Sequence, residues 1–216
     1  MRRVPDDYFD AMYAQSPDPW RLAGRWYERR KYAMTMAMLP LPRYRHAYEP
    51  GCSVGVLTEM LSRRCDHVTA TDVAAAALEV TAERLARAGR SDRVTLERRS
   101  LDSCWPTGGF DLVVLSEVAY YLDAASLRAV MDRECPRLAA GATLIAAHWR
   151  HPVDDYPLTG DEANFVIAKQ PLRWTRRTSS HSSSVMLKIM RSRKMPATHT
   201  QASIEPQLLT AASTIA

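Results

Sequence analysis

Hydrophobic and polar residues follow two different periods along residues 44–149. Short apolar runs with strand-like character fall at residues 47–52, 67–73, 93–99, 110–118 and 142–149. Between them the apolar positions recur at helical spacing, as in Val54, Leu57, Met60 and Leu61, and again across residues 74–88 and 126–138. Such strand–helix alternation predicts an α/β fold: a doubly wound, mostly parallel sheet with helices on both faces and a ligand at the carboxyl ends of the strands.

The two flanking segments have a different character. Residues 1–43 are rich in aromatic residues and methionine, and residues 25–39 have the pattern of a helix. We expect this segment to be an N-terminal helical lid or cap on a core of residues 44–170. Residues 171–216 contain many serines and threonines and few apolar alternations, which is the composition of a divergent, poorly ordered tail. Within that tail, SSVMLKIM (183–190) is the strand-like piece.

Composition places the chain among soluble globular proteins, because 46% of its 216 residues are apolar and 25% are charged. The formal net charge of +5 suggests a nucleic-acid partner until it is located. Residues 171–216 hold seven basic residues and one acid, whereas residues 1–170 hold 22 basic and 23 acidic residues. The basicity therefore belongs to the tail, and the body gives no indication of nucleic-acid binding.

Targeting and redox signals favour a cytoplasmic protein. No apolar run approaches the roughly 18 residues of a membrane span, and the first residues lack the apolar stretch of a secretion signal. The four cysteines (Cys52, Cys65, Cys104 and Cys135) form no CxxC pair, which argues against zinc and against a disulfide framework. Asp154 and Asp155 have no supporting ligand cluster, so we expect a solvated loop there and no metal site.

A glycine-containing turn joins the first predicted strand to the helix that follows it, in the sequence YEPGCSVGVLTEM (48–60). Gly51 and Gly55 permit a tight turn and a close approach of a ligand to the main chain. Asp72 lies 21 residues after Gly51, at the end of the next strand, where a carboxylate can accept the hydroxyls of a ribose. The simpler interpretation is that the glycines only make a turn.

Two nucleotide cofactors fit a turn of this kind. A dinucleotide would call for G-x-G-x-x-G, but Ser53 and Val56 break that pattern. Glu49, just before the turn, would repel a pyrophosphate and suits a cationic sulfonium and ammonium. S-adenosylmethionine carries those charges and no phosphate, so the charge pattern favours it.

Four stretches, in this order, resemble the nodulation protein S group of class I methyltransferases: DPWRLAGRWYERRKYA, EPGCSVGVLTEML, TATDV and FDLVVLSEVAYYL. The resemblance covers about residues 15–150. It implies a Rossmann-like, seven-stranded sheet and methyl transfer from S-adenosylmethionine. The namesake proteins N-methylate the free amine of a deacylated chitooligosaccharide, so the resemblance points to a small-molecule acceptor, an amino sugar or a similar amine. Other relatives act on other sugars or metabolites.

The resemblance also implies a set of cofactor-binding positions. Glu49, Gly51, Cys52, Ser53 and Gly55 would line the methionine end, Asp72 would bind the ribose, and Val73 would flank the adenine. Ser100 or Asp102, with Leu101 between them, would face the adenine amino group, and Ser116 completes the set. Trp20 and Arg21 would close over the cofactor, although Trp20 could equally be a core aromatic.

Glu117 is the main candidate for the chemistry, because it follows directly on the strand LVVLS at the carboxyl edge of the sheet. A carboxylate there can hold an ammonium or hydroxyl and accept its proton; the alternative is that it only caps a turn. His148 is a second candidate base, with a structural role as its alternative. Tyr120 and Tyr121 could shape a sugar-sized substrate pocket or serve as packing.

The C-terminal segment leaves other functions open. The resemblance implies a helix and two more strands after the fifth strand, but the composition of the tail leaves open that these strands are missing or divergent. A non-catalytic or inactive binder of S-adenosylmethionine is therefore one alternative. A nicotinamide-dependent oxidoreductase is another, and a nucleic-acid methyltransferase is less favoured because no NPPY-type tetrad follows the fourth strand.

Overall fold

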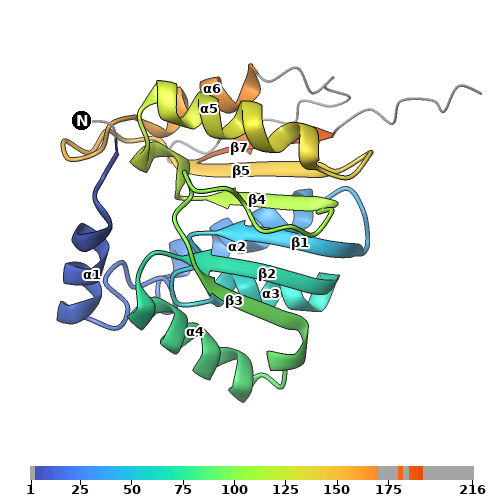
Figure 1. The fold of residues 1–216 in the computed structure, drawn as a ribbon. Coiled ribbons are helices and arrows are strands. Elements are labelled where there is room, and N and C mark those ends of the chain that lie inside the picture. The colour runs from blue at the N-terminus through green and yellow to red at the C-terminus, as the bar shows by residue number, and fades with distance from the viewer. Residues whose placement is uncertain (1–2, 170–179, 182–184, 192–216) are drawn as a thin grey trace, which may run out of the picture.

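Seven strands form one mixed sheet in the order β3-β2-β1-β4-β5-β7-β6 (Figure 1). The structure is a computed structural model that describes residues 3–169, 180–181 and 185–191. The strands are β1 (Tyr44–Pro50), β2 (Cys65–Asp72), β3 (Val94–Arg98), β4 (Leu112–Ser116), β5 (Thr143–Trp149), β6 (Ser180–His181) and β7 (Val185–Arg191). The first five are parallel, and β7 pairs antiparallel with β5 and with β6.

The described helices alternate with these strands. They are α1 (Asp6–Gln15), α2 (Trp26–Met38), α3 (Val56–Arg64), α4 (Ala75–Arg87), α5 (Ala124–Glu134) and α6 (Gly160–Ala168), with short 3-10 helices η1 (Ser91–Arg93), η2 (Ala119–Tyr121) and η3 (Cys135–Arg137). No helix in the described part of the chain has both the length and the apolar character of a membrane span. The α/β fold predicted from the alternating pattern is confirmed.

The pleat of the central strands sends side chains into two separate cores. In β4, Leu112 and Val114 pack with α2 and α3, whereas Val113 and Leu115 pack with α5 and α6. Both faces of β4 are covered, which explains its continuous apolar run. Helix α4 lies against α3 and the β2–β3 edge.

The predicted helix over residues 126–138 differs in detail from the structure. It starts earlier, at Ala124, because the side chain of Asp123 accepts a hydrogen bond from the backbone N–H of Ser126 and caps the helix. It ends at Glu134 and continues as the 3-10 helix η3, which contains Pro136. Proline lacks the N–H that an α-helix interior requires.

The predicted tail, residues 171–216, contains one segment that belongs to the sheet. Val185–Arg191, inside the predicted tail, is β7 and pairs with β5 along its whole length, from Trp149 opposite Val185 to Thr143 opposite Arg191. A strand at that position covers the open edge of β5. The terminal strands are therefore present in the described sheet, and most of residues 171–216 lies outside the described residues.

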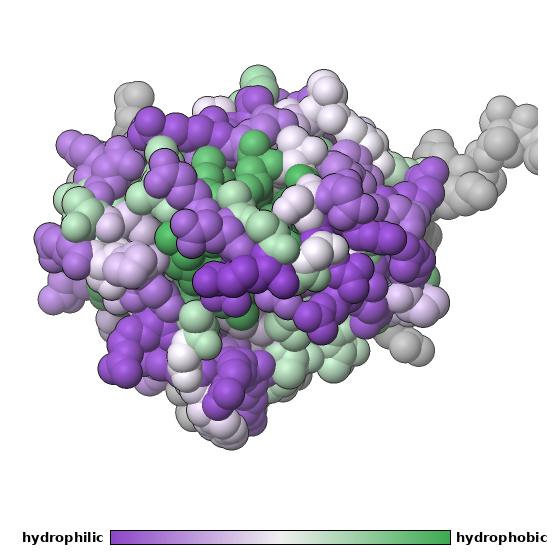
Figure 2. All heavy atoms as spheres, turned by 90° about the horizontal axis from the view of Figure 1, so that it is seen from below, coloured by the Kyte–Doolittle hydropathy of each residue, from purple (hydrophilic) through white to green (hydrophobic). Residues whose placement is uncertain are grey.

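The carboxyl ends of the parallel strands face the N-terminal segment. Helix α1 stands beside this edge of the sheet, apart from the two helical layers (Figure 1). Seen from the β3–α4 side, the surface is mainly hydrophilic, and apolar residues gather near the middle of the view (Figure 2). The strand order places the ends of β1, β2 and β4 next to one another, which is where a ligand binds in doubly wound sheets.

Candidate cofactor and acceptor site

A cavity of about 590 Å³ lies at the carboxyl edge of the sheet, between the strand ends and the N-terminal helices. Thirteen of the predicted site residues line it: Trp20, Glu49, Gly51, Cys52, Ser53, Asp72, Val73, Ser100, Leu101, Ser116, Glu117, Tyr120 and Tyr121. Four predicted residues are not among its lining: Arg21, Gly55, Asp102 and His148. The sheet therefore brings most of the predicted set together.

The loop after β1 has a left-handed backbone at alternate positions, with φ of 70° at Gly51, 51° at Ser53 and 71° at Gly55. A Cβ on Gly51 would lie 2.8 Å from the Cγ2 of Val118. A Cβ on Gly55 would lie 2.6 Å from the Cγ2 of Thr81. Gly55 thus allows α3 and α4 to approach each other, and the structure gives it a packing role outside the cavity in place of the predicted ligand contact.

Asp72 ends β2 and is buried at the cavity wall. Its Oδ2 accepts a hydrogen bond from the backbone N–H of Ser53 at 2.9 Å, and its Oδ1 accepts one from that of Ala74 at 3.0 Å. Burial raises the pKa of Asp72, and these backbone donors oppose the rise. The carboxylate therefore fixes the glycine loop and still faces the cavity, as the ribose-binding prediction requires.

Glu49 lies near the end of β1, is only 3% exposed and lines the same cavity. Its Oε2 is buried without a hydrogen-bond partner among the described residues. Burial raises the pKa of Glu49 to about 8; the nearby Thr58 hydroxyl opposes the rise, and the charge of Asp72 adds to it. A buried carboxylate without a partner is costly, so this oxygen is suited to a cationic ligand group.

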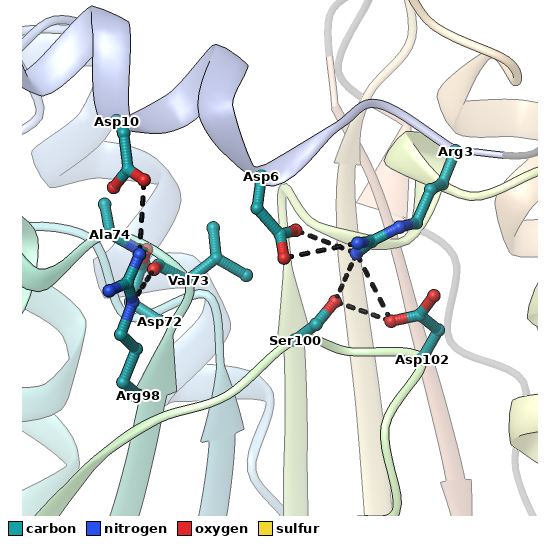
Figure 3. A network of polar contacts seen from close by, with 9 residues as sticks. All are labelled: Arg3, Asp6, Asp10, Asp72, Val73, Ala74, Arg98, Ser100 and Asp102. Carbon is teal, nitrogen blue, oxygen red and sulfur yellow. Dashed lines mark hydrogen bonds and ion pairs between the residues drawn. The ribbon is translucent and has the colours of Figure 1, made fainter.

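The loop after β3 is tied to the N-terminal segment through Arg3 (Figure 3). The guanidinium of Arg3 donates to Ser100 Oγ at 2.8 Å and to Asp102 Oδ1 at 3.4 Å, and it also pairs with Asp6. Ser100 donates in turn to Asp102 at 2.6 Å. Ser100 lines the cavity, but Asp102 is held by Arg3 outside it, so the structure favours Ser100 of the two predicted alternatives.

A second contact in Figure 3 joins α1 to the end of β3. Arg98 donates to Asp10 at 3.2 Å and to the backbone carbonyl of Val73 at 2.7 Å. Val73 lines the cavity beside Asp72. Helix α1 is thereby fixed against the strand ends that form the cavity wall.

Tyr13 of α1 closes the cavity above the glycine loop. It is buried, and its hydroxyl forms a short hydrogen bond with Ser53 Oγ. Trp20 also lines the cavity, and its ring lies 5.7 Å from the ring of Tyr13. Arg21 is exposed and has a φ of 57°; Arg25 lines the cavity in its place. Arg21 therefore does not line the cavity in this structure, and the residues of the N-terminal segment that cover the glycine loop are the aromatic Tyr13 and Trp20.

Glu117 follows β4 with a left-handed backbone, φ 55°, which residues other than glycine rarely adopt. Its Oε1 accepts a hydrogen bond from Lys31 Nζ at 3.0 Å. Its Oε2 accepts from the Tyr120 hydroxyl at 2.8 Å and from the backbone N–H of Trp149 at 2.8 Å. The carboxylate is therefore held rigidly at the cavity wall by donors from three segments, with a side chain 19% exposed.

Lys31 and Glu28 line the cavity, but sequence reasoning did not single them out. Both lie on the buried face of α2, which also carries Tyr32, Thr35 and Met36. The spacing 28-31-32-35-36 is that of one helix face. Two charged residues on a core-facing stripe are the signal that could have identified them.

Two tyrosines shape the far wall of the cavity. Tyr120 stacks on Tyr156 at 5.1 Å between ring centroids, and Tyr121 makes edge contacts with Tyr156 and Phe9. Burial raises the pKa of both Tyr120 and Tyr121 well above the usual value, so their hydroxyls stay protonated. They contribute aromatic surface to the cavity wall, while the Tyr120 hydroxyl donates to Glu117 and the Tyr121 hydroxyl pairs with that of Tyr156.

His148 is fully buried behind this wall, and both of its ring nitrogens have partners. Its Nε2 accepts a hydrogen bond from the backbone N–H of Ala119 at 3.2 Å, and its Nδ1 lies 3.2 Å from Asn164 Oδ1. Burial lowers the pKa of His148. The alternation of β5 sends Leu144, Ala146 and His148 to the face covered by α5 and α6. This geometry removes His148 from the candidates for the base and supports its structural alternative.

The family model of nodulation protein S (NodS) matches residues 11–192 of this chain. Nodulation protein S of Rhizobium tropici is 34% identical over 130 residues, which are 59% of this chain and 53% of that protein. Nodulation protein S of Bradyrhizobium diazoefficiens is 35% identical over 133 residues, which are 59% of this chain and 61% of that protein. The matched part thus spans little more than half the length of these relatives.

Similar solved structures include two methyltransferases. A Pseudomonas syringae protein described as a methyltransferase is 38% identical, with a TM-score of 0.64, over 77% of this chain and 99% of that one. The N-methyltransferase NodS of Bradyrhizobium japonicum WM9, in complex with S-adenosyl-L-homocysteine, is 22% identical, with a TM-score of 0.73, over 86% of this chain and 97% of that one. The fold is that of class I methyltransferases.

Proposed function

Because this chain belongs to the nodulation protein S family, we propose that it is an S-adenosylmethionine-dependent methyltransferase acting on a small molecule. The reaction we propose is N-methylation of an amino sugar or a similar amine. The resemblance and the named relatives support the reaction class, and the cavity residues support the choice of cofactor and acceptor.

The observation that carries the proposal is the buried carboxylate of Glu49. Its Oε2 has no hydrogen-bond partner among the described residues, yet it lies on the wall of the cavity. The amino group of S-adenosylmethionine is a cation that would favour and satisfy the ionised form of this carboxyl, whereas the pyrophosphate of a dinucleotide would be repelled by that form. Asp72 ends the neighbouring strand β2, in which Ala70 lies opposite Glu49. The two acids suit the ammonium and the ribose of one ligand.

The remaining residues fit the same cofactor. Ser53, Cys52 and Gly51 would line the methionine part, Val73 and Leu101 would flank the adenine, and Ser100 and Ser116 offer hydroxyls to polar groups. The bound cofactor would supply an electrophilic methyl group on a sulfonium. Tyr13 and Trp20 cover the glycine loop and would exclude water from that end of the cavity.

The acceptor would bind at the end of the cavity formed by Glu117, Tyr120 and Tyr121. Glu117 can accept a hydrogen bond from the acceptor amine and orient its lone pair, and its fixed position reduces the entropy cost of that alignment. A carboxylate at this position can also accept the proton that the amine must lose. The tyrosine rings offer an apolar face for a sugar ring or a flat metabolite.

The experiment is a methyl-transfer assay with S-adenosylmethionine labelled in the methyl group and a glucosamine oligomer as acceptor. The fully N-acetylated oligomer is the matched control, because it lacks the free amine. Transfer to the first and not to the second supports the proposal. Transfer to neither, from a protein that binds S-adenosylhomocysteine, would overturn the amino-sugar acceptor.

A further inference from the structure

A cluster of three buried charges joins α2 to the end of β4. Lys31 Nζ lies 2.5 Å from Glu28 Oε2 and 3.0 Å from Glu117 Oε1. The side chain of Lys31 is 2% exposed and that of Glu28 is 9% exposed. One ammonium thus forms ion pairs with two carboxylates, and the three side chains together carry one net negative charge.

The surroundings of Lys31 fix its position. Its ammonium lies 5.0 Å from the ring centre of Tyr32 and 5.9 Å from that of Tyr27. Such cation–π contacts hold a desolvated ammonium in place. An arginine at position 31 would not make the same contacts, because its guanidinium is longer and planar, whereas the site between two rings and two carboxylates holds a compact ammonium.

We propose that Lys31 is a positioning residue for Glu117, and that α2 thereby completes the acceptor end of the cavity. This inference rests on the proposed methyltransferase function. Lys31 neutralises one of the two carboxylates and holds Oε1 of Glu117, whereas Tyr120 and Trp149 hold Oε2. The cluster keeps a single negative charge, which suits an acceptor that arrives as an ammonium ion.

The physical reason is like-charge repulsion. Glu28 and Glu117 both contact the same ammonium, so without it two carboxylates would share one poorly hydrated site. Other titratable groups that face the cluster come from α2, the turn after β4, and β5: Tyr27, Tyr32, Tyr120 and His148. Glu49 of β1 lines the same cavity and lies near Tyr32. Lys31 is the cation that the structure places between the two acids.

The test compares Lys31→Met with the double variant Lys31→Met/Glu28→Gln. The double variant removes one negative charge together with the lysine, and so restores the net charge of the cluster. Lys169→Met is the matched control, because Lys169 is exposed on the end of α6, where its ammonium lies over the ring of Phe165. Thermal midpoints are measured at about pH 5.5 and about pH 8.5. These values lie on either side of the pH range in which a glutamic acid loses its proton when a second carboxylate lies beside it.

In the single variant, folding favours proton uptake by the two acids, so its stability falls as the pH rises. The thermal midpoint of the single variant should lie below that of wild type, and we expect this difference to be larger at pH 8.5 than at pH 5.5 by about 3 °C or more. The double variant should lose this pH dependence and regain turnover on the glucosamine oligomer, about 10-fold or more above the single variant. Affinity for S-adenosylhomocysteine should stay within a few-fold of wild type throughout.

A deficit that is equal at both pH values, and equal in the single and double variants, would show that Lys31 only packs α2, and would overturn the proposal. If the single variant does not fold, folding of the double variant supports the charge account, and failure of both overturns it. Failure of the wild type to bind S-adenosylhomocysteine would instead contradict the proposed function, whereas the midpoints would still report on the charge cluster.

Discussion

Asp72, at the end of β2, accepts a hydrogen bond from the backbone N–H of Ser53 in the glycine loop, with 2.9 Å between the two atoms. Ser53 has the left-handed φ of 51° at the centre of that loop. One carboxylate therefore both fixes the loop and faces the cavity. The cofactor site that we propose is therefore built across two neighbouring strands, β1 and β2.

Replacing Asp72 by alanine should weaken the binding of S-adenosylhomocysteine by about 1.5–3 kcal/mol, the usual contribution of hydrogen bonds to a charged group. Isothermal titration calorimetry measures the change. Asp66→Ala is the control, because Asp66 is an exposed acid near the start of the same strand that pairs with Arg43. Unchanged affinity in a folded Asp72→Ala protein would contradict the ribose assignment.

Binding of S-adenosylhomocysteine should release a proton from Glu49 at neutral pH. The pKa of Glu49 is raised to about 8 by burial, so the group is largely protonated in the free protein, and a bound ammonium favours its charged form. Affinity should therefore rise with pH up to about 8. Calorimetry in buffers of different ionisation enthalpy counts the released protons, and Glu49→Gln should release none at this site.

The same shift affects stability. The folded-state pKa of Glu49 lies above the ordinary value of 4.5, so the stability that it contributes is present at low pH and lost as the pH rises toward 8. Glu49→Gln should lack this loss, so its thermal midpoint should gain on that of wild type between pH 4.5 and 8. A constant difference between the two proteins over this range would rule out the raised pKa.

Glu117→Gln should lower turnover on an amine acceptor by about 10²–10⁴-fold, which is the usual contribution of a positioned acid or base. Affinity for S-adenosylhomocysteine should remain within a few-fold, because Glu117 faces the acceptor in our proposal. The glutamine loses the ion pair with Lys31, so the thermal midpoint is measured in parallel. Full turnover in the variant would make Glu117 only a structural residue of the turn.

His148→Phe should destabilise the protein without removing a catalytic group. The backbone N–H of Ala119 loses its buried acceptor, which costs about 1–3 kcal/mol, and the contact with Asn164 is lost as well. A chemical denaturation curve measures the loss. If stability were unchanged while turnover fell by orders of magnitude, His148 would be the base after all.

Much of the part of the cavity that we assign to the cofactor, around Glu49 and Asp72, can be predicted from local sequence pattern. Glu49 and Asp72 come near or at the ends of buried strands, and parallel strands present those ends at one edge, so their proximity is predictable. The acceptor half depends on which segment docks over that edge. Lys31 and Tyr13 come from N-terminal helices whose placement is determined by tertiary contacts such as Arg3 with Ser100, and no local period encodes these contacts.

His148 shows a different limit. It lies next to the end of β5, which suggested a place at the edge of the sheet, but the alternation of strand side chains decides which face a residue meets. The sequence shows that alternation, but it does not show that Asn164 of α6 is the partner of His148. Gly55 is similar: the sequence predicts a turn glycine, and only the packing of Thr81 shows what the missing side chain makes room for.

The most direct test of the central claim is a calorimetric titration of the wild-type chain with S-adenosylhomocysteine, with NAD as the competing candidate ligand. We expect binding of one S-adenosylhomocysteine per chain, accompanied by proton release near neutral pH, and no binding of NAD. Binding of NAD in place of S-adenosylhomocysteine, or binding of neither by the folded protein, would contradict the account.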